Sequence, residues 1–424
     1  MQLKRGAALY RDVWFDKPPL LPWFYVLWGA ADGIVLRVAG AIYDLCACGL
    51  AFQLARTLWT KREGYIAGAL LAFFLTFDTH SAVVPLGADL LLLAPHLAAL
   101  LFAVKRQPWL AGVAAGIGFL VNAKAVFVVA ACAAFIWPSI VPLALGFALP
   151  CLLAAGLLAL TGSLNDWYAQ AWVWPALYAA SPIVSDPVRN GLVRSANWLG
   201  FHATLVFGAV AFYRQNRNWR LAVWATLAFA GVVLGWRFFP RYYFLLLPAL
   251  IMPAARGLTL LRRPLLVLAL GLLTIPAVRF GPKYVNVSTS PDLFLDRDSR
   301  EAARLALKIA GEDSTLYVWG YRPELFVYTR MRPATRYIDS QALTGVPADR
   351  HLTQSTVVLT DGTKAAREEL ARSEPDILMD GLTPFNPNLS MDHYAELRPW
   401  LANYREVART HGTIVYQRKP QTQK

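Results

Sequence analysis

The chain has 424 residues, of which 56% are hydrophobic and only 16% are charged, whereas soluble domains carry about 25% charged residues. This composition excludes an ordinary soluble enzyme and a disordered or collagen-like chain. The formal net charge is +14, and residues 1–280 hold 22 basic and 9 acidic side chains, which account for almost all of it. A basic surplus confined to the most apolar sequence indicates membrane topology and excludes nucleic acid as the partner.

The polar residues 1–19 precede the first apolar run and include Lys4, Arg5, Arg11 and Lys17. A short basic N-terminus normally stays in the cytoplasm. The charges of the later loops nevertheless require the first full helix of this chain to begin outside. We therefore expect a further membrane helix to precede Met1 in the full protein.

Apolar runs long enough to cross a bilayer, about 17–25 residues, follow one another through the first two thirds of the chain. They cover residues 33–58, 64–80, 83–104, 139–161, 198–213, 219–235, 242–261 and 264–280. A further run, 109–137, is interrupted by Asn122-Ala-Lys124, and we expect two short helices that meet at this polar break. The pattern predicts about ten membrane helices.

Basic pairs and clusters between these runs set the expected orientation. The segments Lys61-Arg62, Lys105-Arg106, 214–220 and Arg262-Arg263 are assigned to the cytoplasm. Counting crossings then places Lys124 on the outer side within the membrane, where an unpaired ammonium is costly and usually functional. The aromatic-rich segment 163–197 also lies outside and is typical of an amphipathic helix in the membrane interface, with Asp166 as its cap.

The sequence changes character after residue 280. Helices are expected at 297–310 and 363–373, and short strands at 315–319, 376–380 and 413–417. We therefore predict three segments: an outer loop at 1–19, a transmembrane domain at 20–280 and an α/β domain at 281–424. The predicted fold class is an all-α polytopic membrane protein with a small C-terminal α/β extracytoplasmic domain.

The sequence contains no recognisable metal-binding motif. Its four cysteines all lie in apolar runs, and His80, His96 and His202 have no metal-ligand spacing. We predict no zinc site and no structural disulfide. No cofactor is indicated, although a carboxylate pair together with a phosphate could recruit a divalent cation.

Four motifs in chain order carry a resemblance to a known family. They are the segment Tyr10 to Leu20 with Asp16-Lys17-Pro-Pro, Gly87-Ala-Asp89-Leu, Asn122-Ala-Lys124, and Arg237-Phe-Phe-Pro-Arg241-Tyr242. Together they resemble the GT-C membrane glycosyltransferases, of the kind that includes protein O-mannosyltransferases and lipid A aminoarabinose transferases. The resemblance covers nearly the whole chain, including a soluble domain after the last helix.

The resemblance implies an inverting transfer of a sugar from a polyprenyl-phosphate donor. It implies that Asp89 is catalytic and that the donor phosphate is bound by Lys17, Lys124, Arg237, Arg241 and Tyr242. Such chemistry needs a carboxylate to take the acceptor proton and cations to hold the leaving phosphate. The family's principal acidic residue lies upstream of the segment that matches this N-terminus, so it would precede Met1.

Each candidate also has a structural interpretation. Asp89 could be a helix N-cap, and the basic residues could be interfacial anchors that extend to the membrane surface. Arg37 is a further site candidate that could instead pair with Asp32 or Asp44. Asp12 and Asp16 are candidate substitute bases, or solvated loop carboxylates.

We therefore predict an integral membrane hexosyl- or pentosyltransferase in the bacterial inner membrane, with its C-terminal domain extracytoplasmic. Its partners would be a polyprenyl-phosphate-linked sugar, a lipid, glycan or protein acceptor, and membrane lipids. Two alternatives stay open. One is an inactive relative that binds lipid-linked sugar or scaffolds a glycosylation complex, and the other is a membrane transporter.

Overall fold

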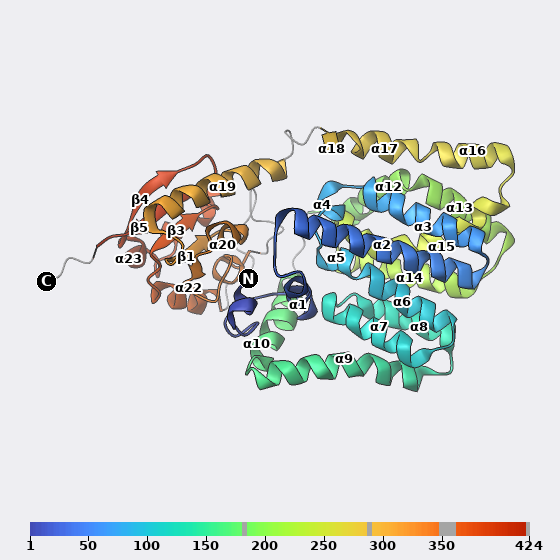
Figure 1. Cartoon of the computed structure of the whole chain (residues 1–424), viewed down its shortest axis with the longest axis horizontal. Coiled ribbons are helices and arrows are strands. Elements are labelled where there is room, and N and C mark those ends of the chain that lie inside the picture. Colours follow the sequence, from blue (N-terminus) through green and yellow to red (C-terminus); the bar gives the residue numbers. More distant parts are fainter. Residues whose placement is uncertain (180–184, 286–290, 347–361, 421–424) are drawn as a thin grey trace. The chain divides into compact units, whose positions relative to one another are not determined.

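The computed structural model describes residues 1–179, 185–285, 291–346 and 362–420. The chain forms two compact units, which are described separately (Figure 1). The helical unit consists of Lys17–Thr161 and Pro182–Val285. The α/β unit consists of Met1–Asp16, Gly162–Ser181 and Asn286–Lys424.

The first part of the helical unit runs from the Pro18-Pro19 pair to the end of a long apolar helix. Its helices are α1 (Leu20–Leu27), α2 (Gly33–Leu58), α3 (Lys61–Thr76), α4 (His80–Val83), α5 (Ala88–Leu91), α6 (Leu93–Val104), α7 (Pro108–Val121), α8 (Ala125–Ile136) and α9 (Ile140–Leu160). The helices α7 and α8 meet at residues 122–124, as predicted. The predicted run 83–104 is divided instead, because Pro85 and Gly87 interrupt it before α5.

The second part of the helical unit begins at Pro187. Its elements are α12 (Pro187–Phe201), α13 (Ala203–Gln215), α14 (Trp219–Val233), the 3-10 helix η3 (Pro240–Leu245), α15 (Leu247–Leu260), α16 (Arg263–Gly271), α17 (Thr274–Phe280) and α18 (Pro282–Val285). Asp186 caps α12 by accepting a hydrogen bond from the Arg189 N–H at 2.9 Å. The predicted run 242–261 thus starts with a tight 3-10 turn, since Pro240 and the residues around it do not continue an α-helix.

Three stretches of the described helices are long and apolar enough to cross a membrane. They are Gly33–Leu58, Ile140–Leu160 and Arg263–Val285. A fourth qualifies if α12 and α13, which are bent by 86° at His202, are counted as one span. Further apolar helices are shorter, such as Pro108–Val121 and Ala125–Ile136. The count of about ten membrane helices therefore stays a prediction.

Glycines let helices of this unit approach closely. A Cβ atom at Gly146 of α9 would lie 2.2 Å from the Trp109 carbonyl oxygen of α7, and one at Gly112 would lie 2.1 Å from the Leu143 oxygen. Small residues at crossings are characteristic of membrane helices, whose association depends on close van der Waals packing. The unit has one continuous apolar core that joins α2, α3, α6, α8, α14 and α15.

The α/β unit contains a mixed five-stranded sheet in the order β2-β1-β3-β5-β4. The strands are β1 (Thr315–Trp319), β2 (Arg332–Pro333), β3 (Ile377–Asp380), β4 (Tyr404–Arg409) and β5 (Ile414–Arg418). Strands β1, β2 and β3 are parallel, whereas β5 pairs antiparallel with β3 and β4. The three predicted strands and both predicted helices are present, and sequence analysis missed β2 and β4.

Both faces of this sheet are covered, because the side chains of β1 alternate between two cores. Tyr317 and Trp319 belong to one core, and Leu316 and Val318 to the other. The helices α19 (Pro291–Ala310) and α20 (Glu324–Thr329) cover the second face. The first face is covered by α22 (Thr363–Ala371) and α23 (Arg398–Leu401), and the short α21 (Gln341–Thr344) adds to it.

The aromatic segment after α9 belongs to the α/β unit. It forms α10 (Leu164–Tyr168), the π-helical turn η2 (Ala169–Val173) and α11 (Trp174–Ala179). Trp174 packs edge-on against Trp14 at 5.7 Å between ring centroids, and buried Gln170 donates a hydrogen bond to the Tyr10 carbonyl oxygen at 2.9 Å. Part of the aromatic segment that was expected to form an amphipathic helix in the membrane interface therefore packs into a protein core.

Asp166 is not a cap as expected, since its carboxylate accepts from Arg336 of the same unit at 3.3 Å.

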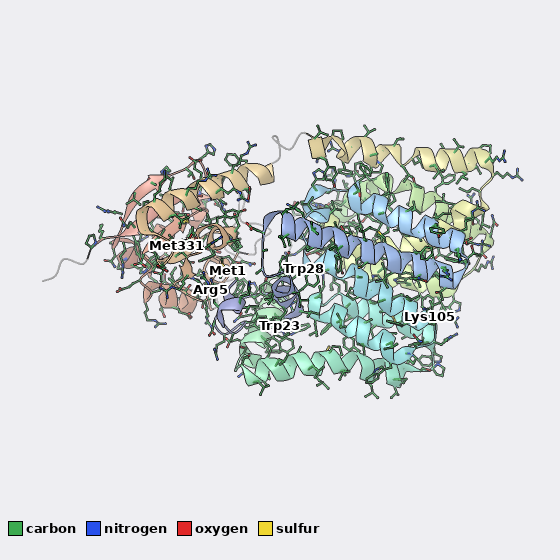
Figure 2. All side chains as sticks on the ribbon, in the orientation of Figure 1. Met1, Arg5, Trp23, Trp28, Lys105 and Met331 are labelled. Carbon is green, nitrogen blue, oxygen red and sulfur yellow. The ribbon has the colours of Figure 1, made fainter. Side chains whose placement is uncertain are left out.

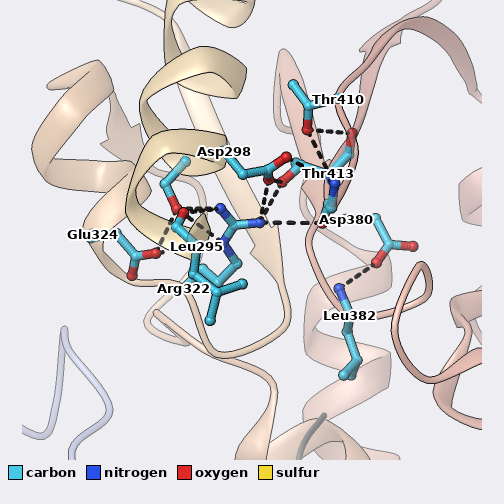
Figure 3. Close-up of polar contacts among 10 residues, drawn as sticks. Leu295, Asp298, Arg322, Glu324, Asp380, Leu382, Thr410 and Thr413 are labelled. Carbon is cyan, nitrogen blue, oxygen red and sulfur yellow. Dashed lines mark hydrogen bonds and ion pairs between the residues drawn. The ribbon is translucent and has the colours of Figure 1, made fainter. Parts of the chain in front are cut away.

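A buried arginine joins three elements of the α/β unit (Figure 3). Arg322, which follows β1, donates to the Asp298 carboxylate of α19 at 2.7 Å and to the Leu295 carbonyl oxygen at 2.9 Å. It also donates to the Thr413 hydroxyl before β5 at 2.6 Å. Because the charge is compensated and its hydrogen bonds are made, this contact is a structural clamp between α19, β1 and β5.

Candidate functional site

Asp89 lies at the start of the short helix α5 in the helical unit. The N-cap of α5 is Gly87, and no side chain caps it, so the interpretation of Asp89 as an N-cap is wrong. Its carboxylate instead accepts a hydrogen bond from the Asn122 side-chain amide at 2.9 Å. Asn122 belongs to the polar break between α7 and α8, so a residue distant in the sequence holds the Asp89 carboxylate in place.

Lys124 occupies the same break. Its backbone N–H donates to the Asn122 side-chain oxygen at 3.1 Å, which fixes the turn between the two helices. Its ammonium lies 3.6 Å from an Asp89 oxygen and 2.9 Å from the centroid of the Tyr242 ring. The Nζ atom is buried and makes no hydrogen bond with any residue that the structure describes, although the lysine side chain carries three donors. Lys124 thus does not extend to the interface, as a mere anchoring lysine would.

The 3-10 helix η3 supplies the third side of the site. The Nε atom of Arg241 lies 3.4 Å from the second Asp89 oxygen, and its guanidinium also lies 4.9 Å from the centre of the Phe239 ring. The Arg241 side chain is 48% exposed, whereas those of Lys124 and Asp89 are each 13% exposed. One carboxylate is therefore held between a buried ammonium and a half-exposed guanidinium.

The loop before η3 carries Arg237 and has a strained backbone. Arg237 is buried, and its positive charge repels the Lys124 ammonium. Its neighbours Trp236 and Phe238 adopt positive φ angles of 54° and 49°. Bulky residues rarely adopt this left-handed conformation, which costs about 1–3 kcal/mol each and is concentrated at functional sites. We name Asp89, Asn122, Lys124, Arg237, Arg241 and Tyr242 the Asp89 cluster.

The structure places the other predicted site residues as follows. Lys17 is half-buried directly before the Pro18-Pro19 pair in the helical unit. Arg37 of α2 donates to the Val84 carbonyl oxygen at 3.1 Å, and the described residues show no ion pair of Arg37 with either carboxylate considered for it.

Asp12 and Asp16 belong to the α/β unit. Asp12 is exposed, pairs with Arg11 at 2.8 Å and accepts a hydrogen bond from the Ala8 N–H. Asp16 is buried, so it is not the solvated loop carboxylate that was one expectation.

An aromatic stack that was not predicted from the sequence joins η3 to α12. Tyr243 stacks on Trp198 at 4.8 Å, and Trp198 stacks on His202 at 3.9 Å between ring centroids. The Tyr243 hydroxyl is 2.8 Å from the Ser195 hydroxyl. A helical spacing of Ser195, Trp198 and His202 was visible in the sequence, but the partner in η3 was not.

The structure gathers no set of three or more His, Cys, Asp or Glu side chains that could hold a metal within its described ranges. The Asp89 cluster itself contains one carboxylate and three cations, so it favours an anion over a metal ion.

Comparisons with known proteins show what the chain and its fold are similar to. Residues 16–165 match the family model described as dolichyl-phosphate-mannose-protein mannosyltransferase. The crystal structure of ArnT from Cupriavidus metallidurans in the apo state is similar with a TM-score of 0.60 and 17% identity, over 97% of this chain and 90% of that chain. The same protein bound to undecaprenyl phosphate gives 0.59 and 16%, over 99% and 93% of the two chains. No curated protein matches the chain significantly.

The chain therefore has the fold of ArnT, and both findings agree with the resemblance predicted from the sequence. Among GT-C glycosyltransferases, the chain is similar to the mannosyltransferases of the matched family model and to ArnT.

Proposed function

We propose that the protein is an integral membrane glycosyltransferase that moves a sugar from a polyprenyl-phosphate donor to an acceptor, with inversion at the anomeric carbon. The observation that carries the proposal is the Asp89 cluster, in which the buried Lys124 ammonium faces the Asp89 carboxylate and forms no hydrogen bond with the described residues. The family model match and the binding of undecaprenyl phosphate by ArnT support a lipid phosphate as the anion that this cluster binds.

The charge of the cluster suits an anion that gains negative charge as it leaves. Lys124 and Arg241 share the one carboxylate of Asp89, so their positive charge exceeds its negative charge. A polyprenyl-phosphate sugar is a phosphodiester with one negative charge, whereas the phosphomonoester that leaves carries up to two. A site that matches the leaving phosphate stabilises the transition state more than the bound donor, which is the requirement for catalysis.

The proposed roles follow from this arrangement. Lys124, Arg237 and Arg241 hold the phosphate, the Tyr242 ring positions the Lys124 ammonium, and Lys17 is proposed as a further phosphate ligand. Asp89 acts as the carboxylate that positions or deprotonates the acceptor hydroxyl. The proposal does not use Asp12, Asp16 or Arg37.

The outer face of the bacterial inner membrane is the proposed side of the reaction. The segment α5–α6 begins near Asp89 and ends at Lys105, so these two residues lie at opposite ends of it. Figure 2 shows Trp23 of α1 and Trp28, which directly follows α1, at one end of the helical unit and Lys105 at the other. Since Lys105 and Arg106 belong on the cytoplasmic side by the positive-inside rule, Asp89 is assigned to the outer side.

The test is sugar transfer by the purified full chain in lipid nanodiscs, with radiolabelled polyprenyl-phosphate sugars as donors and bacterial membrane extract as acceptor. The wild type should release free polyprenyl phosphate, and Asp89→Asn and Lys124→Ala should abolish the release. Lys105→Met, on the opposite side, is the control and should keep full activity. Full activity of both site variants would refute the assignment.

A wild-type protein that binds the donor without cleaving it would be the inactive relative. Movement of intact donor across a vesicle membrane would identify a transporter.

A further inference from the structure

The Asp89 carboxylate occupies the position between two cations that a phosphate would also take. One of its oxygens faces Lys124 at 3.6 Å and the other faces Arg241 at 3.4 Å. Both separations are longer than the 2.7–2.9 Å that is usual for charge-assisted hydrogen bonds. The two ion pairs are therefore loose, and a better anion can replace the carboxylate at low cost.

The third contact of Asp89 is different. The Asn122 amide donates to it at 2.9 Å, which is an ordinary hydrogen-bond distance. Asn122 is itself fixed, because its side-chain oxygen accepts from the Lys124 backbone N–H. A carboxylate that loses both cations would thus still be held at the site by a neutral donor.

Lys124 and Arg241 both have N–H donors that form no hydrogen bond with the described residues. Arg241 contacts Asp89 through Nε, its side chain is half exposed, and no hydrogen bond to its terminal nitrogens is formed by the described residues. This leaves one edge of the guanidinium open for a phosphate. The Lys124 ammonium makes no hydrogen bond at all in the described structure.

From this geometry we propose that Asp89 is a resident anion: it holds Lys124 and Arg241 in place until the phosphate of the lipid displaces it from both. The inference rests on the proposed function. It adds that the Asp89 carboxylate is paired with both cations before the donor binds and released from them afterwards. While it is paired, one oxygen of the carboxylate faces Lys124 and the other faces Arg241. Once the phosphate binds these cations, the oxygen that faced Arg241 can accept a hydrogen bond from the acceptor hydroxyl instead.

Donor binding thereby prepares the base for the transfer step. In that step the proton of the acceptor hydroxyl passes to Asp89 as the hydroxyl oxygen forms a bond to the anomeric carbon. The bond between this carbon and the phosphate oxygen breaks, and its electron pair stays on the phosphate.

The loss of the Asp89 charge should change the affinity for undecaprenyl phosphate in one direction if Asp89 is a resident anion, and in the other if its role is purely structural. If Asp89 competes with the phosphate, Asp89→Asn should bind undecaprenyl phosphate about tenfold more tightly than the wild type, because a negative charge within a few ångströms is removed. If Asp89 only organises the cations, its loss should weaken binding. Asp89→Ser removes the same charge with a smaller side chain and provides a second test should the asparagine variant fold poorly.

The experiment measures the affinity of undecaprenyl phosphate for the full chain in nanodiscs, with undecaprenol as the control lipid. Undecaprenol has the same tail without the phosphate, so its affinity should be equal in all folded variants. Tighter phosphate binding by Asp89→Asn and Asp89→Ser, with weaker binding by Lys124→Met, is the expected result.

Equal or weaker binding by both Asp89 variants would overturn the inference while leaving the proposed function intact. Unchanged binding by Lys124→Met would instead overturn the phosphate site of the proposed function.

Discussion

Lys124 and Arg241 are two of the cations that we propose to bind the phosphate, and replacing them one at a time should give effects of different size and different salt dependence. The Lys124 side chain is 13% exposed and that of Arg241 is 48% exposed. Removing a buried charge from a charged pair costs about 2–5 kcal/mol, so Lys124→Met should weaken undecaprenyl phosphate binding at least about 30-fold. Water screens the half-exposed Arg241, for which about 1 kcal/mol, or about fivefold, is expected.

Salt separates the two contributions further. The Debye length falls from about 10 Å at 0.1 M to about 3 Å at 1 M, and buried pairs are screened less than exposed ones. The assay is a titration of undecaprenyl phosphate at both salt concentrations, with Lys105→Met as the control. The Arg241→Met effect should nearly vanish at high salt, and the Lys124→Met effect should persist. Equal effects with equal salt dependence would refute the role assigned to burial.

The remaining predictions concern the support of the cluster and the stability of the α/β unit. A Cβ atom at Gly191 of α12 would lie 2.5 Å from the buried ring of Phe238, so Gly191→Ala should displace the strained loop and weaken undecaprenyl phosphate binding about tenfold. Nothing lies within 4 Å of such an atom at Gly200 of the same helix, so Gly200→Ala should bind normally. Burial raises the pKa of Asp298, but hydrogen bonds, among them one from Arg322, outweigh it and hold this pKa below 3.8. The resulting stabilisation is present above about pH 4 and is lost as the pH falls through the lower folded value. Hydrogen exchange of α19 in the full chain, corrected for intrinsic rates, should accelerate over that range. Asp298→Asn should lose about 3 kcal/mol or more at neutral pH and lack this acid step, whereas an unchanged acid step would contradict the assignment.

Local patterns in the sequence predicted the elements of the fold well. The apolar run 109–137 with its Asn-Ala-Lys interruption folds as two helices that meet at the break, and the three predicted strands of the C-terminal sheet are all present. These features depend on periodicity and on nearby breaking residues, which a single sequence contains.

Contacts between segments that are distant in the sequence could not be predicted from local patterns. Asn122 bonds to Asp89, 33 positions earlier, and nothing in either local pattern specifies that pairing. Likewise, Trp174 has the spacing of an interfacial aromatic residue, yet it packs against Trp14, because a protein core and a membrane interface both favour a half-buried indole. Side-chain chemistry identified members of the site, whereas their partners required the three-dimensional fold.

The central claim is that the Asp89 cluster binds the phosphate of a polyprenyl lipid. It is tested most directly by an experimental structure of the full chain with undecaprenyl phosphate in nanodiscs, in which the phosphorus atom is located. We expect phosphate oxygens within hydrogen-bond distance of Lys124 Nζ and the Arg241 guanidinium, with Asp89 held by Asn122 alone. A phosphate bound elsewhere, with Asp89 still paired to both cations, would contradict it.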